Sequence, residues 1–479
     1  MDGLPRSTPA AQGVDPAAVL AFVDAVEADP EVELHSLMVV RHGHVVAEGW
    51  WAPYTAQRPR LVYSVSKSVT STALGMAVDE GLVRLDDTVI SHFPELADEV
   101  TDPRSRSITL RDLASMSSGH DRDMWQDALA GDRDEPVRGF LLLPPDQAPG
   151  SVFAYNQPCT YTLAAVIQRR AGMRLSDYLS TRLFGPLGIG EVAWQSHPAG
   201  REIGFSGLFA RTEDVAALGL LYLQRGRWGE RRLLSESYVE QATSRRVATP
   251  LMPDPDWQQG YGFQFWLSRH GFRADGAFGQ FSLVLPEHDA VVALTAGTEA
   301  TQALLDHVWE RLLPGLGATR VDGEAQADLE HRLSSRRMPP GGGDPRPASG
   351  QAASPLRFDV AADPAEAPSV RLTSVTVDAT DTGLHVTLHE QRNALTFEAG
   401  YGGWSVSEPE DAHGAVVPVA GSAGWRDDQT LVIGVAFLET PHRMEIVCSV
   451  PTHAARATWQ VAPLDGGRLS TLHRPARES

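Results

Sequence analysis

Ser64 and Lys67 stand three positions apart in the stretch YSVSKSV, where helix signals begin near Val65. The chain contains 41 Lys plus Arg residues, and Lys67 is the only lysine among them. A serine hydroxyl becomes a good nucleophile when a nearby base takes its proton. Lysine can be that base when burial lowers its pKa, whereas arginine stays charged. Because residues i and i+3 of a helix share a face, the pair favours a serine nucleophile with a lysine base. The alternative is a solvated lysine that survived by chance.

A second group of polar residues directly precedes a predicted amphipathic helix, in the stretch GSVFAYNQPCTYTLAAVIQRRAG. Tyr155 could relay a proton to a leaving group if it lay near Ser64 and Lys67. The carboxamides of Asn156 and Gln157 could hold a substrate amide or carbonyl. By itself this group is weak evidence, because a tyrosine after a phenylalanine is more often packed in a core.

A third candidate lies on a predicted strand that reads RADGAFGQ. Gly276 permits close approach of another backbone, and the N–H of Ala277 could join that of Ser64 as an oxyanion hole. The alternative is a glycine at a β-bulge. The motifs GxSxG, HExxH, GxGxxG and the P-loop are absent from the sequence, as are clustered metal ligands, so neither a metal nor a cofactor is expected.

The composition limits the class of protein that can carry these residues. With 479 residues, 42% of them apolar and 21% charged, the chain predicts a soluble globular protein of two domains. The net charge of −20 argues against nucleic-acid and anionic-membrane partners. Cys159 and Cys448 lack CxxC-type neighbours and are expected to be reduced thiols. The first twenty residues lack a basic segment and an apolar segment, which predicts a cytoplasmic protein.

The helices and strands that must position the candidate residues are predicted from the spacing of apolar residues and from turn and cap residues. A helix is predicted over 16–28, then two strands around the turn His42-Gly43, and a helix-rich middle. Strand signals return over 260–269, 272–286 and 290–297, followed by a helix over 300–313. The prediction is a mixed α and β fold with an antiparallel sheet of two early and three late strands, covering residues 1–331. Residues 332–355 are rich in Pro, Gly and Ser and predict a linker, and 356–479 predict an all-β barrel or sandwich.

The order of Ser64-x-x-Lys67, a tyrosine about ninety residues later and then a glycine strand resembles the serine β-lactamase and penicillin-binding-protein superfamily. It is most similar to class C β-lactamase-related serine hydrolases, which include esterases, D-aminopeptidases, amidases and some acyltransferases. The resemblance covers roughly residues 8 to 315 and includes LVYSVSKSVTSTALGMAVDEGLVRLDDTV and ITLRDLASMSSGH. It implies a five-stranded antiparallel sheet flanked by helices. It also implies that Ser64 is acylated, that Lys67 accepts its proton and that Tyr155 is a second acid/base. Which of Lys67 and Tyr155 acts first stays open.

Two departures from the family pattern bear on the substrate. The usual Tyr-x-Asn motif ends here in Gln157, which is one methylene longer. The usual third motif begins with Lys or His, but here it reads Ala274-Asp275-Gly276. A cation for a substrate carboxylate is therefore missing, and strand alternation would point Arg273 to the other face. This predicts weak penicillin hydrolysis and a preference for neutral acyl substrates.

The leading hypothesis is a serine hydrolase that cleaves a small-molecule ester, amide or peptide through an acyl-enzyme on Ser64. An acyltransferase or peptide cyclase would use the same intermediate, and a catalytically inactive binding protein is a third possibility. The sequence leaves open the substrate, the oligomeric state and the role of the C-terminal domain. The aromatic residues Trp50, Trp51 and Tyr54 could line a pocket, although such residues more often pack in a hairpin core.

Overall fold

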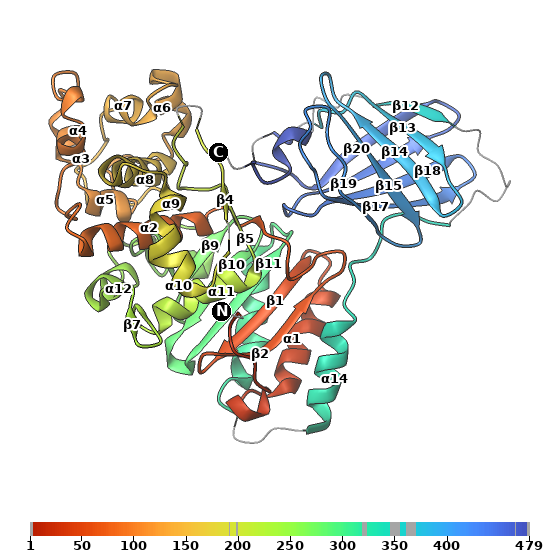
Figure 1. Cartoon of the computed structure of the whole chain (residues 1–479), viewed down its shortest axis with the longest axis horizontal. Helices are drawn as coiled ribbons and strands as arrows, with labels where there is room; N and C mark the ends of the chain where they lie inside the picture. Colours follow the sequence, from red (N-terminus) through yellow and green to blue (C-terminus); the bar gives the residue numbers. More distant parts are fainter. Residues whose placement is uncertain are drawn as a thin grey trace.

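The chain folds into a sheet with helices on both faces, followed by a β-barrel (Figure 1). The computed structural model describes residues 3–190, 192–197, 200–318, 323–344, 355–360, 370–464 and 466–476. The mixed α and β fold predicted from the sequence is confirmed.

The central sheet has six strands, in the order β2-β1-β11-β10-β9-β8, and neighbouring strands are antiparallel. Early and late segments of the chain therefore meet at the centre, where β1 pairs with β11. The predicted turn between the first two strands is confirmed, since His42 and Gly43 have φ values of 48° and 75°. The strands are β1 (Leu34–Arg41), β2 (His44–Trp50), β8 (Trp266–Leu267), β9 (Phe272–Gly276), β10 (Gln280–Leu285) and β11 (Ala290–Ala296).

The sheet differs from the sequence prediction in its late strands. The stretch 272–286, which the sequence predicts as one strand, is a hairpin of β9 and β10. The chain reverses at Phe278 and Gly279, with φ values of 66° and 83°. Because phenylalanine rarely adopts positive φ, the sequence contains no turn signal there beyond the glycine. Ala277 therefore lies in this turn, after the end of β9. The predicted strand 260–269 contributes only the two residues of β8.

Helices cover both faces of the sheet. The predicted first helix is confirmed as α1 (Pro16–Ala28), whose N-cap Asp15 accepts a hydrogen bond from the backbone of Ala17. On the face covered by α1 lie α13 (Thr301–His307) and α14 (Gly323–Ser334), and on the other face α11 (Thr212–Leu223) crosses β1, β10 and β11. Trp51 and Tyr54 are buried in the core beneath α1, which matches the packing alternative for these aromatics.

A helical region is inserted between the early and late strands and carries two of the candidate segments (Figure 1). Within it, α2 packs against α8 and also against β9, so these elements converge near the start of α2. A small sheet of β3, β5 and β4 lies beside this point. The elements are β3 (Arg60–Leu61), α2 (Val65–Asp79), α3 (Val89–His92), α4 (Pro103–Ser107), α5 (Leu110–Ala114), α6 (Trp125–Gly131), α7 (Pro136–Leu141), α8 (Gln157–Ala171), α9 (Leu175–Leu179), α10 (Gly185–Leu187), β4 (Ala193–Trp194), β5 (Leu208–Ala210), β6 (Arg227–Trp228), β7 (Arg231–Arg232) and α12 (Glu236–Ala242).

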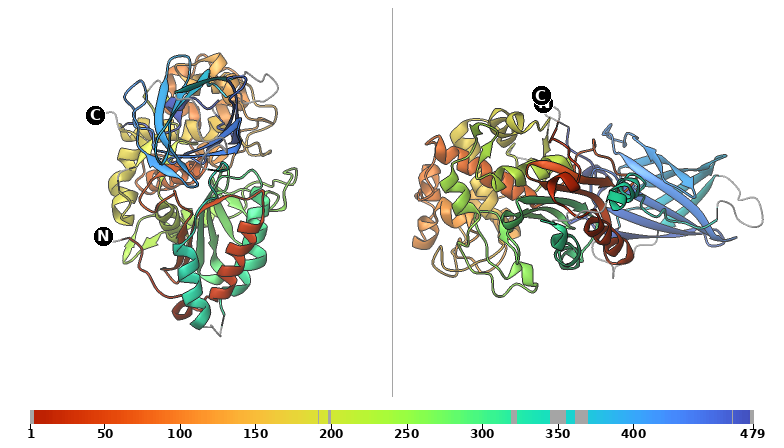
Figure 2. Two further views of the ribbon diagram at one scale, coloured as in Figure 1. Left: turned by 90° about the vertical axis from the view of Figure 1, so that its right-hand side faces the viewer. Right: turned by 90° about the horizontal axis from the view of Figure 1, so that it is seen from below.

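The C-terminal strands form a closed barrel with its own apolar core (Figure 2, left). Antiparallel neighbours run from β12 to β15 and from β17 to β20, and two parallel pairings, β12–β20 and β15–β17, close the ring. The strands are β12 (Leu356–Val360), β13 (Ser374–Ala379), β14 (Gly383–His389), β15 (Ala394–Tyr401), β16 (Ser405–Ser407), β17 (Val419–Asp427), β18 (Thr430–Phe437), β19 (Arg443–Ser449) and β20 (Ala454–Val461).

The segment between the two parts is packed where it is described. Met338 is buried in the core beneath α1, and Asp344 forms a β-bridge with Trp425 of the barrel. Residues 345–354 of the predicted linker lie outside the described residues.

Cys159 and Cys448 are buried free thiols. Among the helices described, none combines the length and apolar character that crossing a membrane requires.

Candidate active site

Ser64 and Lys67 are neighbours at the N-terminus of α2. Ser64 is the N-cap residue, and Nζ of Lys67 lies 2.9 Å from its Oγ. The same Nζ donates a hydrogen bond of 2.8 Å to the backbone carbonyl of Phe205. A neutral amine that donates to Phe205 keeps its lone pair for the Ser64 hydroxyl. The nitrogen is thus placed to accept the serine proton.

Burial lowers the pKa of Lys67 and so favours its action as a base. The residue is 1% exposed, and loss of hydration lowers its pKa from 10.5 to about 7. The carboxylates of Asp123 and Asp275 oppose this effect without reversing it. An uncharged Lys67 is therefore accessible near neutral pH, as general-base catalysis requires.

Tyr155 completes a cluster of three chemically useful side chains. Nζ of Lys67 lies 4.7 Å from the centre of the Tyr155 ring, which stacks on Trp266 at 5.6 Å between ring centres. Burial raises the pKa of Tyr155 well above its usual value, while its interaction with the Ser64 hydroxyl partly offsets the rise. The phenol is therefore protonated at neutral pH and can act as a proton donor.

The backbone next to Ser64 approaches the end of β9 very closely. A Cβ at Gly276 would lie 2.3 Å from the carbonyl oxygen of Val62, so only glycine fits there. This approach brings the turn containing Ala277 next to the start of α2. The N–H groups of Ser64 and Ala277 are therefore candidates for the two donors of an oxyanion hole, as the sequence suggested.

The two carboxamides that follow Tyr155 have different surroundings. Asn156 is fully buried, accepts a hydrogen bond of 2.9 Å from the backbone of Met124 and donates one to Ser118. Its amide thus holds the loop before α6, and its role in substrate binding stays a prediction. Oε1 of Gln157 is buried without a hydrogen-bond partner among the described residues. The predicted role of Gln157 in substrate binding likewise stays a prediction.

The third motif places a charge pair beside the site. Arg273 is fully buried, and its Nε donates to Asp275 at 2.8 Å. Both side chains are on the face of β9 opposite Ala274, whose Cβ packs in the core of the helical region. Arg273 thus lies on the other face from Ala274, as alternation predicted, and the charge of Asp275 is balanced by that guanidinium. Burial nevertheless raises the pKa of Asp275.

Sequence reasoning missed several residues that shape this cluster. Phe205 supplies the carbonyl that orients Lys67, Trp266 stacks on Tyr155, and Asp123 accepts hydrogen bonds from the backbone of Trp125 and Gln157. None of these lies in a motif, because each reaches the cluster only through tertiary folding. A hydrophobic or acidic residue outside a motif carries no sequence signal that it will reach such a position.

Known proteins resemble this chain in sequence and in fold. The profile of the family described as Beta-lactamase matches residues 22–316. A 6-aminohexanoate-dimer hydrolase of Paenarthrobacter ureafaciens is 28% identical over 278 residues, which cover 54% of this chain and 71% of that protein. Penicillin-binding protein 4 of Amycolatopsis lactamdurans is 27% identical over 343 residues, covering 64% and 86%. A crystal structure of SurE with D-Leu has a TM-score of 0.51 at 19% identity, covering 92% of this chain and 98% of that one.

The antiparallel sheet, its helical insertion and a serine beside a buried lysine define the class of protein with a β-lactamase fold. The chain belongs to the Beta-lactamase family and is an enzyme of that family. The resemblance predicted from the sequence is therefore confirmed.

Proposed function

We propose that this enzyme is a serine hydrolase that cleaves an ester or amide through a covalent acyl-enzyme on Ser64. The observation that carries the proposal is the 2.9 Å separation of Lys67 Nζ and Ser64 Oγ, with the pKa of Lys67 lowered to about 7. A lysine in this state can accept a proton at neutral pH, and one at its usual pKa cannot.

The residues of the site fit each step of acyl transfer. Neutral Lys67 takes the proton of Ser64 as Oγ attacks the substrate carbonyl carbon, and the resulting oxyanion is bound by the N–H groups of Ser64 and Ala277. Protonated Tyr155 then gives its proton to the leaving oxygen or nitrogen, and the carbon–heteroatom bond breaks. Lys67 returns its proton to Tyr155. Water attacks the acyl-enzyme with the same groups acting in reverse, which releases the acid and restores Ser64.

The charge of the site favours a neutral acyl group. Ala274 supplies no cation, Arg273 is already paired with Asp275, and Asp123 adds a second carboxylate whose charge acts on Lys67. Apart from Lys67 itself, an anionic substrate meets no unpaired cation among the described residues of this cluster. Penicillins, which carry a carboxylate, should therefore be poor substrates.

Acyl transfer to an amine, including peptide cyclisation, is the second candidate. The carboxylate of Asp123, whose charge acts on Lys67, favours it, because it attracts the ammonium group of an amine acceptor. In this reaction an amine replaces water in the attack on the acyl-enzyme. Because the structure of SurE contains D-Leu, a D-amino-acid amide is the natural acceptor to test.

Mass spectrometry tests the proposal directly. Intact protein is exposed to a fluorophosphonate and, separately, to nitrophenyl esters, D-amino-acid amides and benzylpenicillin. We expect one adduct per chain on Ser64, its loss in Ser64→Ala and its retention in the exposed control Ser91→Ala. Thermal unfolding should show that Ser64→Ala remains folded. Labelling that persists in Ser64→Ala would refute the assignment of the nucleophile. Adding D-leucine amide to the ester reaction distinguishes transfer from hydrolysis by the mass of the product.

A further inference from the structure

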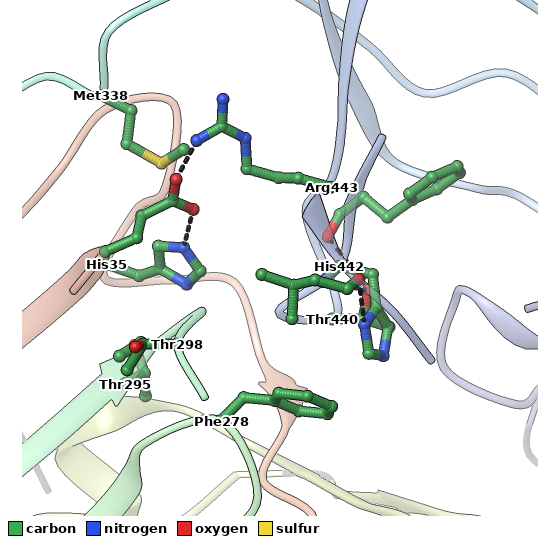
Figure 3. Close-up of polar contacts among 12 residues, drawn as sticks. His35, Phe278, Thr295, Thr298, Met338, Thr440, His442 and Arg443 are labelled. Atoms are coloured by element: carbon green, nitrogen blue, oxygen red, sulfur yellow. Dashed lines mark hydrogen bonds and ion pairs between the residues drawn. The ribbon is translucent and has the colours of Figure 1, made fainter. Parts of the chain in front are cut away.

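One turn of the C-terminal barrel is buried against the segment that leads into Ser64. This turn joins β18 to β19 and consists of residues 438–442, here called the β18–β19 turn. The carbonyl of Glu439 accepts a hydrogen bond of 2.8 Å from the N–H of Leu61, and the carbonyl of Thr440 accepts one of 3.0 Å from Arg60. Figure 3 shows Thr440 and His442 facing the first part of the chain, with Phe278 nearby. The barrel therefore contacts the chain only a few residues before the nucleophile.

His442 makes the contact that lies nearest to Ser64. Its Nε2 lies 2.6 Å from the hydroxyl of Tyr63, and its Nδ1 lies 3.1 Å from the carbonyl oxygen of Val461. Because a carbonyl can only accept, Nδ1 carries the ring proton, and Nε2 accepts from the Tyr63 hydroxyl. Burial lowers the pKa of His442 to about 3, which keeps the imidazole neutral and this tautomer in place at neutral pH.

Two of the residues that His442 contacts, Tyr63 and Phe278, are in an unfavourable backbone conformation. Tyr63 has a φ of 48° and directly precedes Ser64, and Phe278 has a φ of 66° and directly follows Ala277. Such residues persist when their surroundings hold them in place. The rings of Tyr63, Phe278 and His442 form a triangle with centre-to-centre distances of 5.3, 5.5 and 5.9 Å. One side chain of the barrel thus packs against the neighbours of both candidate oxyanion donors.

We propose that His442 is a positioning residue of the active site, which holds Tyr63 and Phe278 so that the N–H groups of Ser64 and Ala277 converge on the oxyanion. This inference rests on the proposed function, because an oxyanion forms only if Ser64 attacks a carbonyl. Oxyanion donors act in the transition state and contribute little to binding of the substrate. The barrel therefore acts on the rate of acylation, and its β18–β19 turn is part of what makes the site work.

Substitutions at His442 distinguish a role in positioning Tyr63 and Phe278 from a contact that only stabilises the fold. His442→Leu removes the acceptor for the Tyr63 hydroxyl, whereas His442→Gln can place an amide oxygen near the former position of Nε2. Loss of one oxyanion donor lowers kcat by about a hundredfold to a thousandfold, and misplacement should cause a smaller loss. We expect His442→Leu to lower the acylation rate constant and kcat by about tenfold or more with KM unchanged, and His442→Gln to recover most of the loss.

Two further variants complete the design. Tyr63→Phe removes only the hydroxyl of the same contact, so it should cause a loss similar to that of His442→Leu, and the double variant should lose no more than either single one. Because Tyr63→Phe is a small change, it also tests the inference if His442→Leu does not fold. Glu408→Gln is the control, since it breaks a 2.6 Å ion pair between the barrel and Arg58 without touching Tyr63. Its kinetics should match the wild type.

The measurement is the rate of Ser64 acylation by a nitrophenyl ester, together with steady-state kcat and KM. The inference is overturned if His442→Leu and Tyr63→Phe acylate as fast as Glu408→Gln, if only KM changes, or if the two losses multiply. Wild-type protein that shows no adduct on Ser64 would overturn the proposed function and the inference with it. A wild type that is acylated beside unaffected variants would overturn the inference alone.

Discussion

Replacing Lys67 with arginine distinguishes a role of Lys67 as a general base from a role as a positive charge only. Lys67 has two polar neighbours, Ser64 Oγ at 2.9 Å and the Phe205 carbonyl at 2.8 Å, and both could still receive hydrogen bonds from a guanidinium. Arginine cannot lose its proton at any ordinary pH, so Lys67→Arg keeps a cation and removes the base. General-base catalysis contributes about a hundredfold to ten-thousandfold. We expect kcat/KM to fall about a thousandfold, near the middle of that range.

The pH dependence follows from the lowered pKa of Lys67. With a pKa of about 7, about half of the wild-type enzyme should have a neutral amine at pH 7. At pH 5 that fraction is about one in a hundred, so wild-type kcat/KM should be about fiftyfold lower there. The rate should rise with pH through 7 and level off above it. Lys67→Arg has no group that titrates in this way, so the rise of kcat/KM with pH near 7 should be absent from the residual activity of this variant.

The assay is hydrolysis of a neutral nitrophenyl ester from pH 5 to 9, corrected for spontaneous hydrolysis. Lys67→Met is the matched control, because methionine is unbranched and similar in length but has neither charge nor base. Both variants should be comparably inactive if the base is what matters. Activity of Lys67→Arg within tenfold of wild type, or an unchanged rise of kcat/KM near pH 7, would mean that Lys67 acts only through its charge and that Tyr155 is the base.

Two other predictions concern the edge of the site. Gly276→Ala would place a Cβ 2.3 Å from the carbonyl of Val62, so the turn after β9 must move; we expect kcat to fall about a hundredfold, comparable to loss of an oxyanion donor. Gly403→Ala, where no atom lies within 4 Å, is the control, and equal kinetics of the two variants would contradict the reasoning. Asp275→Asn removes the partner of buried Arg273 and should raise kcat/KM for benzylpenicillin relative to a neutral ester by about tenfold, from a charge-assisted contact. Efficient penicillin hydrolysis by the wild type would show that the site already presents a cation.

The chemistry of the site was the part that the sequence indicated best. Ser64 and Lys67 lie one helical turn apart, so their contact is local and follows from spacing once α2 begins at Val65. The isolated lysine in an arginine-rich chain was informative because arginine cannot replace a base. That early and late strands share one antiparallel sheet also followed, since alternating runs early and late in the chain need partners.

The hairpin of β9 and β10 shows where local signals fail. Its turn includes Phe278 at a φ of 66°, a conformation that the residue type does not favour. Packing against Tyr63 and His442 holds the phenylalanine there, and that packing comes from segments far apart in the sequence. Secondary-structure propensity depends on a residue and its near neighbours in the sequence, so it cannot predict a contact between distant segments.

The sequence alone determined which groups are available to react, because the proposed nucleophile, its proposed base and the glycine that permits close approach are fixed by residue type and short spacing. Tertiary structure decided how those groups are tuned and held. The lowered pKa of Lys67 needs complete burial, the charge of Asp275 is balanced by Arg273, and Tyr63 is anchored by a histidine from the barrel. Each of these depends on desolvation or on contacts between distant segments, which exist only after the whole chain has folded.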